Sequence, residues 1–411
     1  MKILLINHYA GSIQHGMEYR PYYLARGWVR AGHTVRIVAA SQSHVGSIQP
    51  EFAGRRHDEV IDGINYIWYR TPRYRGNGAG RAFNIAAFCV QLMRDAKRLA
   101  REFEPDVVVA SSTYPMDIWP AHRIARLASA KLVHEVHDLW PLSPIELNGM
   151  SSKHPFIMVC QMAEDFACRR ADAVVSMLPK VHDHMVEHGL DLSRLHIVPN
   201  GVLSEEWDQE GDALAPALAQ HIAQARGEGR MVVIYAGAHG LANALDSLLD
   251  AAATMRSELF SFVLVGSGTE RDRLKERIVS ESLSNVATFG AIPKRQISTL
   301  LSAADVAYIG LQRVPLFRFG IAPDKLMDYM MAGCVVLSAI EAGNDPVMEA
   351  GCGISVQAES APAIAEGLRT LAGLNAETRR AMGLRGRDYV RGPHAWPVLG
   401  MYAAFTAPWD G

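Results

Sequence analysis

The densest group of residues that could do chemistry is the segment 318–333, with the sequence RFGIAPDKLMDYMMAG. Pro323 suits the first position of a helix and Gly333 suits its end, so a short helix is predicted between them. The first backbone amides of a helix lack partners within it and attract negative charge. The segment therefore predicts an anion site at the helix start, formed by the amides of Gly320, Ile321 and Ala322.

Two charged side chains on the predicted helix extend this site. Lys325 and Asp328 are three residues apart and share one face. A cation beside backbone amides suits a nucleotide diphosphate, and a nearby carboxylate can accept hydrogen bonds from ribose hydroxyls. The alternative interpretation is an ordinary surface ion pair. We favour the ligand, because the amides predict an anion site independently of the pair.

Glycines follow several predicted strands, at Gly11 and Gly16, Gly237 and Gly240, and Gly266 and Gly268. Glycine lets backbone amides approach a phosphate, but it is also the ordinary residue of tight turns, so each loop is weak evidence by itself. The first loop lacks the G-x-G-x-x-G pattern of nicotinamide sites, and no G-x-x-x-x-G-K-[ST] pattern of P-loop enzymes occurs.

His137 and Asp138 directly follow the apolar run 131–136. A histidine beside a carboxylate at a strand end is a candidate for catalysis at neutral pH. A structural hydrogen-bonded pair explains the same two residues equally well, and the sequence leaves both interpretations open.

Short apolar runs alternate with helical patterns and must position these residues. In the first half, the sequence predicts a helix at 18–31 and strands at 3–6, 35–40, 106–110, 131–136, 173–177 and 196–198. In the second half it predicts strands at 232–236, 262–265, 286–289, 306–309, 335–338 and 353–356. Helices are predicted there at 244–255, 270–279, 294–303, 323–332 and 361–372. Continuous apolar strands separated by helices predict an α/β fold of two Rossmann-like, doubly wound parallel sheets.

The turn signal at 199–201 divides the chain. We expect an N-terminal domain over 1–203, a linker over 204–229 and a C-terminal domain over 230–390. The segment 391–411 is expected to form a helix that packs back on the N-terminal domain. Doubly wound sheets bind ligands beyond the carboxyl ends of their strands, so we expect the active site in a cleft between the two domains.

Composition narrows the function further. The 411 residues contain 41 Lys and Arg against 43 Asp and Glu, a balance that argues against a protein that binds nucleic acid. Five cysteines without a C-x-x-C pair disfavour a disulfide framework or a zinc site. The apolar start is too short for a signal peptide, and the most apolar window, 82–93, is shorter than a membrane span. We therefore expect a cytoplasmic protein.

The segment 70–101 departs from this overall balance, because basic residues flank its apolar part. They are Arg70, Arg73, Arg75, Arg81, Arg94, Lys97, Arg98 and Arg101. Such a segment could lie peripherally on the anionic inner face of the cell membrane. An amphipathic helix that covers the sheet with its basic residues in water explains the pattern equally well.

Taken in order, the motifs resemble those of retaining glycosyltransferases of family GT4. They are similar in particular to the WbuB-like L-fucosamine transferases of O-antigen and surface-polysaccharide synthesis. The matching pieces are NHYAG at 7–11, HGMEYRP at 15–21, EVHDLWP at 135–141, VPNGV at 198–202, GAHGLAN at 237–243, the segment 323–333 and AGNDP at 342–346. The resemblance implies the GT-B architecture of two facing domains, with the donor bound by the second.

The resemblance also implies roles for individual residues. Asp328 would hold the donor ribose, Gly320 to Ala322 the diphosphate, and the backbone from Gly290 to Ile292 the base. His137, with Asp138, would reach the transferred sugar. The remaining donor-side residues would be Gly237, His239, Asn243, Arg318 and Lys325, and the acceptor-side residues Gly11, Gly16, Glu18 and Arg20.

The chain departs from the family pattern at three positions. Gly320 stands where the family has a carboxylate that touches the sugar, which fits an unusual, deoxy donor sugar. Ala238 and Asn243 stand where it has the Arg and Lys of the diphosphate site. Either Lys325 or Arg318 supplies that charge, or the helix start carries more of it.

The predicted function is retaining transfer of a sugar from a nucleotide diphosphate, in particular UDP, to a lipid-linked or other saccharide acceptor. An N-acetylated deoxyhexosamine such as L-FucNAc is the expected sugar. No D-x-D cluster follows a strand, so no metal or other cofactor is expected. The alternatives are a GT-B sugar-nucleotide epimerase and a non-catalytic subunit that binds a nucleotide sugar.

Overall fold

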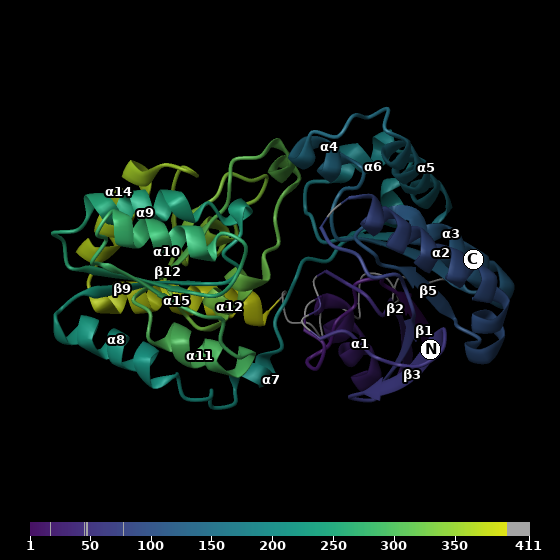
Figure 1. Ribbon diagram of the computed structural model, residues 1–411, viewed down its shortest axis with the longest axis horizontal. Coiled ribbons are helices and arrows are strands. Elements are labelled where there is room, and N and C mark those ends of the chain that lie inside the picture. The colour runs from purple at the N-terminus through teal and green to yellow at the C-terminus, as the bar shows by residue number, and fades with distance from the viewer. Residues whose placement is uncertain (17, 45, 47, 77, 393–411) are drawn as a thin grey trace. The chain divides into compact units, whose positions relative to one another are not determined.

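The computed structural model describes residues 1–392 except residues 17, 45, 47 and 77. These residues form two compact units, one of Met1–Pro199 and one that begins at Asn200. Each unit contains its own sheet, and Figure 1 shows helices on both faces of each. No helix of the described residues is long and apolar enough to cross a membrane.

The first unit contains an eight-stranded sheet in the order β3-β4-β2-β1-β5-β6-β7-β8. The strands are β1 (Lys2–Ile6), β2 (Thr34–Ala40), β3 (Arg56–Ile61), β4 (Ile64–Tyr69), β5 (Val107–Ala110), β6 (Lys131–Val136), β7 (Ala173–Ser176) and β8 (Leu195–Ile197). Neighbouring strands are parallel except β3 and β4. The parallel part of the sheet follows the predicted pattern of buried, continuously apolar strands.

The β3–β4 hairpin was not predicted from the sequence. Its two strands are joined by Asp62 and Gly63, both with positive φ, of 50° and 79°. Asp-Gly between two strand-forming runs is a strong hairpin signal, because this turn needs positive φ at both central residues. The signal was therefore present in the sequence.

The helices of the first unit are α1 (Arg20–Arg30), α2 (Ala79–Phe103), α3 (Ile118–Ala128), α4 (Leu142–Asn148), α5 (Pro155–Arg170) and α6 (His182–Glu187), with 3₁₀ turns η1 (Pro115–Asp117) and η2 (Leu192–Arg194). Helix α2 buries Phe88, Leu92 and Leu99, whose spacing places them on one face. It covers the sheet in this way, as one of the two interpretations of segment 70–101 expects.

The second unit contains a six-stranded, fully parallel sheet in the order β11-β10-β9-β12-β13-β14. The strands are β9 (Met231–Ala236), β10 (Phe260–Val265), β11 (Val286–Phe289), β12 (Val306–Gly310), β13 (Val336–Ala339) and β14 (Gly353–Ser355). Each strand predicted for this half is present, with its ends within two residues of the prediction.

The helices of this unit are α7 (Ser204–Trp207), α8 (Pro216–Gly227), α9 (Leu245–Thr254), α10 (Arg271–Ser280), α11 (Lys294–Ser302), α12 (Asp324–Met331), α13 (Pro346–Ala350), α14 (Ala361–Gly373) and α15 (Ala376–Arg391), with 3₁₀ turns η3 (Leu241–Asn243) and η4 (Pro315–Phe319). Figure 1 shows α9, α10 and α14 on one face of the sheet and α8, α11, α12 and α15 on the other.

The segment expected to be a linker, 204–229, belongs to the second unit, where Leu218, Ile222 and Ala225 of α8 are buried in the core. Of the predicted C-terminal helix, 391–411, residues 393–411 lie outside the described residues, and α15 ends at Arg391.

Candidate functional site

The loops after β9 and β10 touch at the carboxyl end of the second sheet. The His239 N–H donates a hydrogen bond to the Ser267 carbonyl at 2.8 Å. A Cβ atom on Gly266 would lie 1.8 Å from the Gly237 carbonyl oxygen, and one on Gly268 would lie 2.3 Å from that of His239. Only glycine fits at these two positions, so contact between the loops is a sufficient reason for the glycines found there.

The side chain of His239 is fully buried between these loops. Neither ring nitrogen has a hydrogen-bond partner among the described residues. Burial, followed by the positive charges of Arg271 and Lys325, lowers the pKa of His239. The imidazole is therefore neutral and can offer one N–H and one lone pair to a further group.

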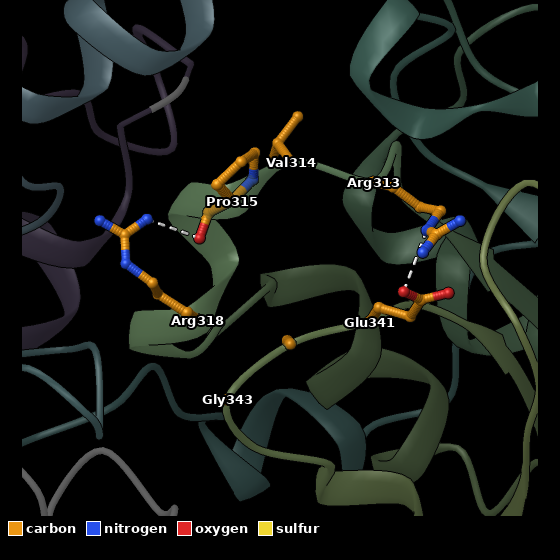
Figure 2. Close-up of a pocket in the computed structure, with 7 residues that line it drawn as sticks. Arg313, Val314, Pro315, Arg318, Glu341 and Gly343 are labelled. Carbon is orange, nitrogen blue, oxygen red and sulfur yellow. Dashed lines mark hydrogen bonds and ion pairs between the residues drawn. The ribbon is translucent and has the colours of Figure 1, made fainter.

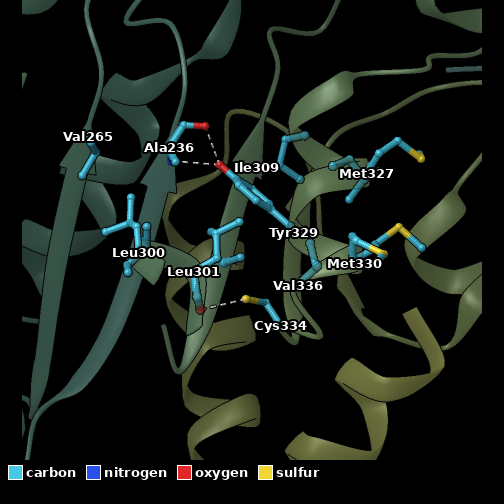
Figure 3. Packing of buried hydrophobic residues seen from close by; sticks show 14 of the residues in the cluster. Ala236, Val265, Leu300, Leu301, Ile309, Met327, Tyr329, Met330, Cys334 and Val336 are labelled. Atoms are coloured by element: carbon cyan, nitrogen blue, oxygen red, sulfur yellow. Dashed lines mark hydrogen bonds between the residues drawn. The ribbon is translucent and has the colours of Figure 1, made fainter. Parts of the chain in front are cut away.

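Helix α12 is fixed to the end of β9 by Tyr329, as Figure 3 shows. The buried Tyr329 hydroxyl accepts a hydrogen bond from the Ala236 N–H at 2.9 Å and donates one to the Ala236 carbonyl at 3.0 Å. The helix ends before Gly333, as predicted, where φ is 72°. It begins at Asp324, one residue later than predicted, with Pro323 as the N-cap.

The position of α12 directs Lys325 to the loop after β9. Its Nζ donates to the Tyr235 hydroxyl at 3.0 Å and to the side-chain oxygen of Asn243. The same nitrogen lies 3.3 Å from the place of a Cβ on Gly237. Burial lowers the pKa of Lys325 to about 8. The ammonium group thus contacts Asn243. Asn243 stands at the position where the resembled family has a cation, so Lys325 places a positive charge there.

Asp328 forms an ion pair with Lys294, which was not predicted. The Lys294 Nζ lies 2.6 Å from both carboxylate oxygens of Asp328. Burial alone would lower the pKa of Lys294, but the Asp328 carboxylate raises it above its ordinary value. Lys294 is the first residue of α11 and follows the loop that contains Gly290 and Ile292. The ion pair therefore links the predicted ribose residue to the loop predicted to meet the base.

The amides expected to bind the diphosphate are partly used within the protein. The Gly320 N–H donates to the Phe317 carbonyl at 2.9 Å, and the Ile321 N–H donates to Asn344 Oδ1 at 2.8 Å. The expectation that both amides point out of the helix start is therefore wrong. The carbonyl of the third residue, Ala322, accepts a hydrogen bond from the Asn200 side-chain amide at 2.7 Å.

Arg318 lines a pocket of about 630 Å³ at the carboxyl ends of β12 and β13, shown in Figure 2. Its guanidinium donates to the Pro315 carbonyl at 2.8 Å, and Arg313 pairs with Glu341 at 3.0 Å. The pocket lies beside Gly320, because a Cβ on Gly343 would be 3.2 Å from the Gly320 nitrogen.

Arg271, at the start of α10, is a cation that was not predicted. One of its terminal nitrogens lies 3.7 Å from the place of a Cβ on Gly290. Its Nε is buried without a partner in the part of the chain that the structure describes. An arginine three residues after the GSG sequence at 266–268 and at a helix start was the available sequence signal.

His137 lies in a charged network at the end of β6 in the first unit. Its Nε2 is 3.2 Å from Glu135 Oε2 and 3.0 Å from Ser111 Oγ, and its Nδ1 is 3.6 Å from Glu18 Oε1. Burial alone would lower the pKa of His137, but Glu135 and Glu18 raise it to about 9. At neutral pH this side chain is therefore an imidazolium ion, which donates hydrogen bonds and cannot act as a general base.

Arg20 fixes Glu135 from the opposite side. Its side chain is 2% exposed and pairs with Glu135 at 2.9 Å. It also donates to the carbonyls of Val198 and Pro199 at 2.8 and 2.9 Å. The Arg20 guanidinium is buried and bonded to these groups. The prediction that Arg20 binds the acceptor directly therefore does not fit the structure. Glu135, a charged residue within an apolar strand, was the sequence signal for this network.

Glu18 is the part of the network that solvent reaches, with 34% of its side chain exposed. Burial alone would raise the pKa of Glu18, but His137 lowers it, so the carboxylate is ionised at neutral pH. The carbonyl of Glu18 accepts from the Gly11 N–H at 2.9 Å. Gly16, with φ of 86°, closes the turn between these residues. Three of the predicted acceptor-side residues thus lie together.

Asp138 does not share the partners of His137. Its carboxylate accepts hydrogen bonds from the Leu139 N–H at 2.9 Å and the Ser143 hydroxyl at 2.6 Å. Burial raises the pKa of Asp138. These bonds hold the turn that leads into α4, and they favour a structural role for Asp138.

Comparisons with known proteins agree with this arrangement. Residues 15–201 match the family model described as glycosyl transferase 4-like domain, and residues 219–389 match the one described as glycosyl transferases group 1. A curated relative is WcaI of Escherichia coli strain K12, named as a colanic acid biosynthesis glycosyl transferase. It is 22% identical over 378 residues, which cover 86% of this chain and 90% of the relative.

Two solved structures show the fold. Sucrose-phosphate synthase from Thermosynechococcus elongatus has a TM-score of 0.72 at 17% identity, with 97% of this chain and 96% of that chain covered. HepE of Anabaena, solved in complex with UDP and glucose, has a TM-score of 0.66 at 15% identity, with 97% of each chain covered. The two family models together span most of the chain, which is therefore a glycosyltransferase of the GT4 family with the GT-B fold.

Proposed function

We propose that the protein transfers a sugar from a UDP-sugar to a saccharide acceptor in the synthesis of a bacterial surface polysaccharide. The observation that carries the donor part is the placement of Lys325 and Asp328 on α12, which Tyr329 fixes to the end of β9. The name of WcaI supports the pathway, and the HepE complex with UDP and glucose supports the donor class.

The second unit is proposed to stabilise the leaving diphosphate. Lys325 supplies a positive charge beside Asn243, and Arg271 supplies another near Gly290. His239 is neutral and has no hydrogen-bond partner among the described residues, so it can donate one further hydrogen bond. Preorganised donors of this kind stabilise the charge that develops as the glycosidic bond breaks. Transfer is accordingly proposed to need no metal, and full activity in excess chelator is the expected result.

The first unit is proposed to bind the acceptor. Glu18 presents an ionised, partly exposed carboxylate that can accept a hydrogen bond from an acceptor hydroxyl. His137, held as an imidazolium, adds positive charge beside it. Retention of anomeric configuration, with the acceptor attacking from the face of the leaving group, is proposed from the family resemblance. Asp138 contributes by holding the turn after His137.

The identity of the sugar is a finer proposal. Gly320 offers no carboxylate to sugar hydroxyls, and the pocket of about 630 Å³ beside it leaves room for a substituent. Both features fit an N-acetylated deoxyhexosamine such as L-FucNAc. A lipid-linked acceptor is proposed from the family resemblance alone.

A thermal-shift screen over UDP-, GDP- and TDP-sugars tests the donor class, because a ligand that binds only the native state raises the melting temperature. We expect the largest shift from a UDP-sugar, followed by release of UDP when a saccharide acceptor is added. If only GDP- or TDP-sugars raise the melting temperature, the proposal that the donor base is uracil is wrong.

One observation favours a sugar-nucleotide epimerase as a second candidate. Such an enzyme needs a pair of catalytic carboxylates, and Glu18 and Glu135 lie on either side of His137. Glu135 is buried, and Arg20 and His137 hold its pKa well below its usual range, so it is a poor proton carrier. Product analysis separates the two, since an epimerase converts the donor without an acceptor.

Peripheral contact with the inner face of the cell membrane is proposed for α2. On this helix Phe83 is 65% exposed and Val90 is 46% exposed. Basic residues follow them in the C-terminal half of the helix. Exposed apolar groups beside basic ones suit an anionic lipid surface. Flotation with anionic vesicles should recover the protein, and replacing Phe83 and Val90 with serine should reduce the recovery. Equal recovery with neutral vesicles would contradict the electrostatic part of the proposal. No recovery with anionic vesicles would contradict membrane contact altogether.

A further inference from the structure

Helices α5 and α6 of the first unit place two histidines and a glutamate together. Glu164 lies in α5, His184 in α6, and His188 is the residue that caps α6. The two histidines are four residues apart and so lie on one face. One ligand atom of each of the three side chains lies within 4.8 Å of the other two. From this arrangement we propose that they form a binding site for a divalent transition metal, in particular zinc.

The distances suit such a site. His184 Nε2 lies 2.8 Å from Glu164 Oε1, and His188 Nε2 lies 3.8 Å from Glu164 Oε2. Ligand atoms bound to one zinc ion at about 2.0–2.2 Å in a tetrahedron are separated by roughly 3.3 Å. The two separations, which go to different oxygens of Glu164, lie on either side of this value. One ligand atom of each side chain already lies within 4.8 Å of the others, so the three side chains are close enough to share one ion after small rotations.

A second layer of polar groups orients these side chains. Asp165 Oδ1 lies 2.8 Å from His188 Nδ1 and can accept a hydrogen bond from the Nδ1–H, which leaves the lone pair on Nε2 for a metal. The Gln161 amide donates to Glu164 Oε2 and to Asp165 Oδ1, both at 2.9 Å. A carboxylate behind a metal-binding histidine is the usual second layer of zinc sites.

Burial adds an independent reason for a cation. Glu164 is 4% exposed and His184 is 8% exposed. A buried carboxylate is costly unless a positive charge compensates it. In the described part of the chain, Glu164 forms its ion pairs with these two histidines. A divalent ion bound by neutral imidazoles supplies that charge.

The proposed site uses other residues than the transfer chemistry but lies close to them. A cavity of about 10 Å³, room for one water at most, is lined by Glu164 and Met185 and also by Glu135 and Asp138. The metal would join the short helix α6 to α5 behind the turn that follows His137. Two nitrogen ligands and one carboxylate leave a fourth position for water, and the set suits zinc better than magnesium or calcium.

Titration of chelator-treated, metal-free protein with Zn²⁺ by calorimetry, and with Co²⁺ by visible absorption, tests the site. We expect one ion per chain, a higher melting temperature, and cobalt bands typical of four-coordination. Glu164→Gln and His188→Gln should each weaken binding by about 100-fold or more, and Asp165→Asn by about 10- to 100-fold.

His182→Gln is the matched control, because His182 is exposed on the same helix and outside the cluster. It should bind zinc like the unaltered protein. Absence of saturable zinc binding, or equal binding by folded His188→Gln protein, would overturn the site. His188 is 21% exposed, so its replacement is expected to leave the fold intact, as circular dichroism would confirm. These readouts use no sugar donor, so they test the site separately from the transfer reaction.

Discussion

The charge on His137 decides what chemistry the first unit can do. The residue was chosen from the sequence as a catalytic candidate beside Asp138, but its partners in the structure are Glu135 and Glu18. Those carboxylates keep it protonated near neutral pH. Its proposed role is therefore electrostatic, and Glu18 is the group that can meet an acceptor hydroxyl.

This charge state predicts how stability depends on pH. The folded pKa of about 9 lies above the ordinary value of 6.5, so the stabilisation is complete below pH 6.5 and is lost as the pH rises through about 9. His137→Gln should lower the free energy of unfolding by about 1.5–3 kcal/mol just below pH 6.5 and by less above pH 9. Urea denaturation of both proteins in these two pH ranges measures the difference, and a difference that does not change with pH would contradict the prediction.

Lys325 gives a prediction for donor binding. With a pKa of about 8, roughly half of the Lys325 side chains are protonated at pH 8 in the free protein. A bound diphosphate favours the charged form, so binding of UDP at this pH should take up about half a proton. Calorimetry in two buffers with different ionisation enthalpies measures the uptake. Lys325→Met should abolish it, and undiminished uptake in that variant would assign the proton to another group.

The spacing within one helix was enough to select Lys325 and Asp328, because both lie on the same short element. Their partners Asn243 and Lys294 are distant in sequence, so these contacts depend on how the loops pack in the fold. Arg271 was missed because its position beside Gly290 also depends on loop packing.

At the scale of elements, the second sheet was predictable because each strand is a short apolar run between helices. The β3–β4 hairpin was missed despite its Asp62-Gly63 turn signal, because β3 is mostly polar and the antiparallel pair interrupts the parallel pattern. The anion site at the start of α12 was predicted from the helix alone, and Asn344 from another loop took one of its amides.

The anchor between α12 and β9 predicts an effect on stability. Tyr329→Phe removes the hydroxyl that satisfies the N–H and carbonyl of Ala236 in a buried place. The free energy of unfolding should fall by about 1–3 kcal/mol, and the affinity for UDP should fall with it because α12 is less well held. Chemical denaturation measures the first effect and calorimetry the second.

Tyr389→Phe is the matched control, since the Tyr389 hydroxyl binds Glu349 at an exposed site. It should change the free energy of unfolding by less than about 1 kcal/mol. Equal decreases in the free energy of unfolding in the two variants would contradict the claim that the Tyr329 hydroxyl anchors α12.

At the scale of the whole molecule, the turn at 199–201 anticipated the division into two α/β units. The family models match one half each, which agrees with that division. The placement of the segment 204–229 was not anticipated. Its acidic, alanine-rich composition suggests a linker, while the buried face of α8 joins it to the second core.

The central claim is that α12 holds the nucleoside diphosphate of the donor, and calorimetric titration of UDP tests it most directly. The unaltered protein should bind UDP, and Asp328→Ala should weaken binding by about 10- to 100-fold through lost hydrogen bonds to ribose. Lys294→Ala breaks the same ion pair but keeps the carboxylate, so it should stay within a few-fold of the unaltered protein. Equal UDP affinity in Asp328→Ala and the unaltered protein would contradict the account.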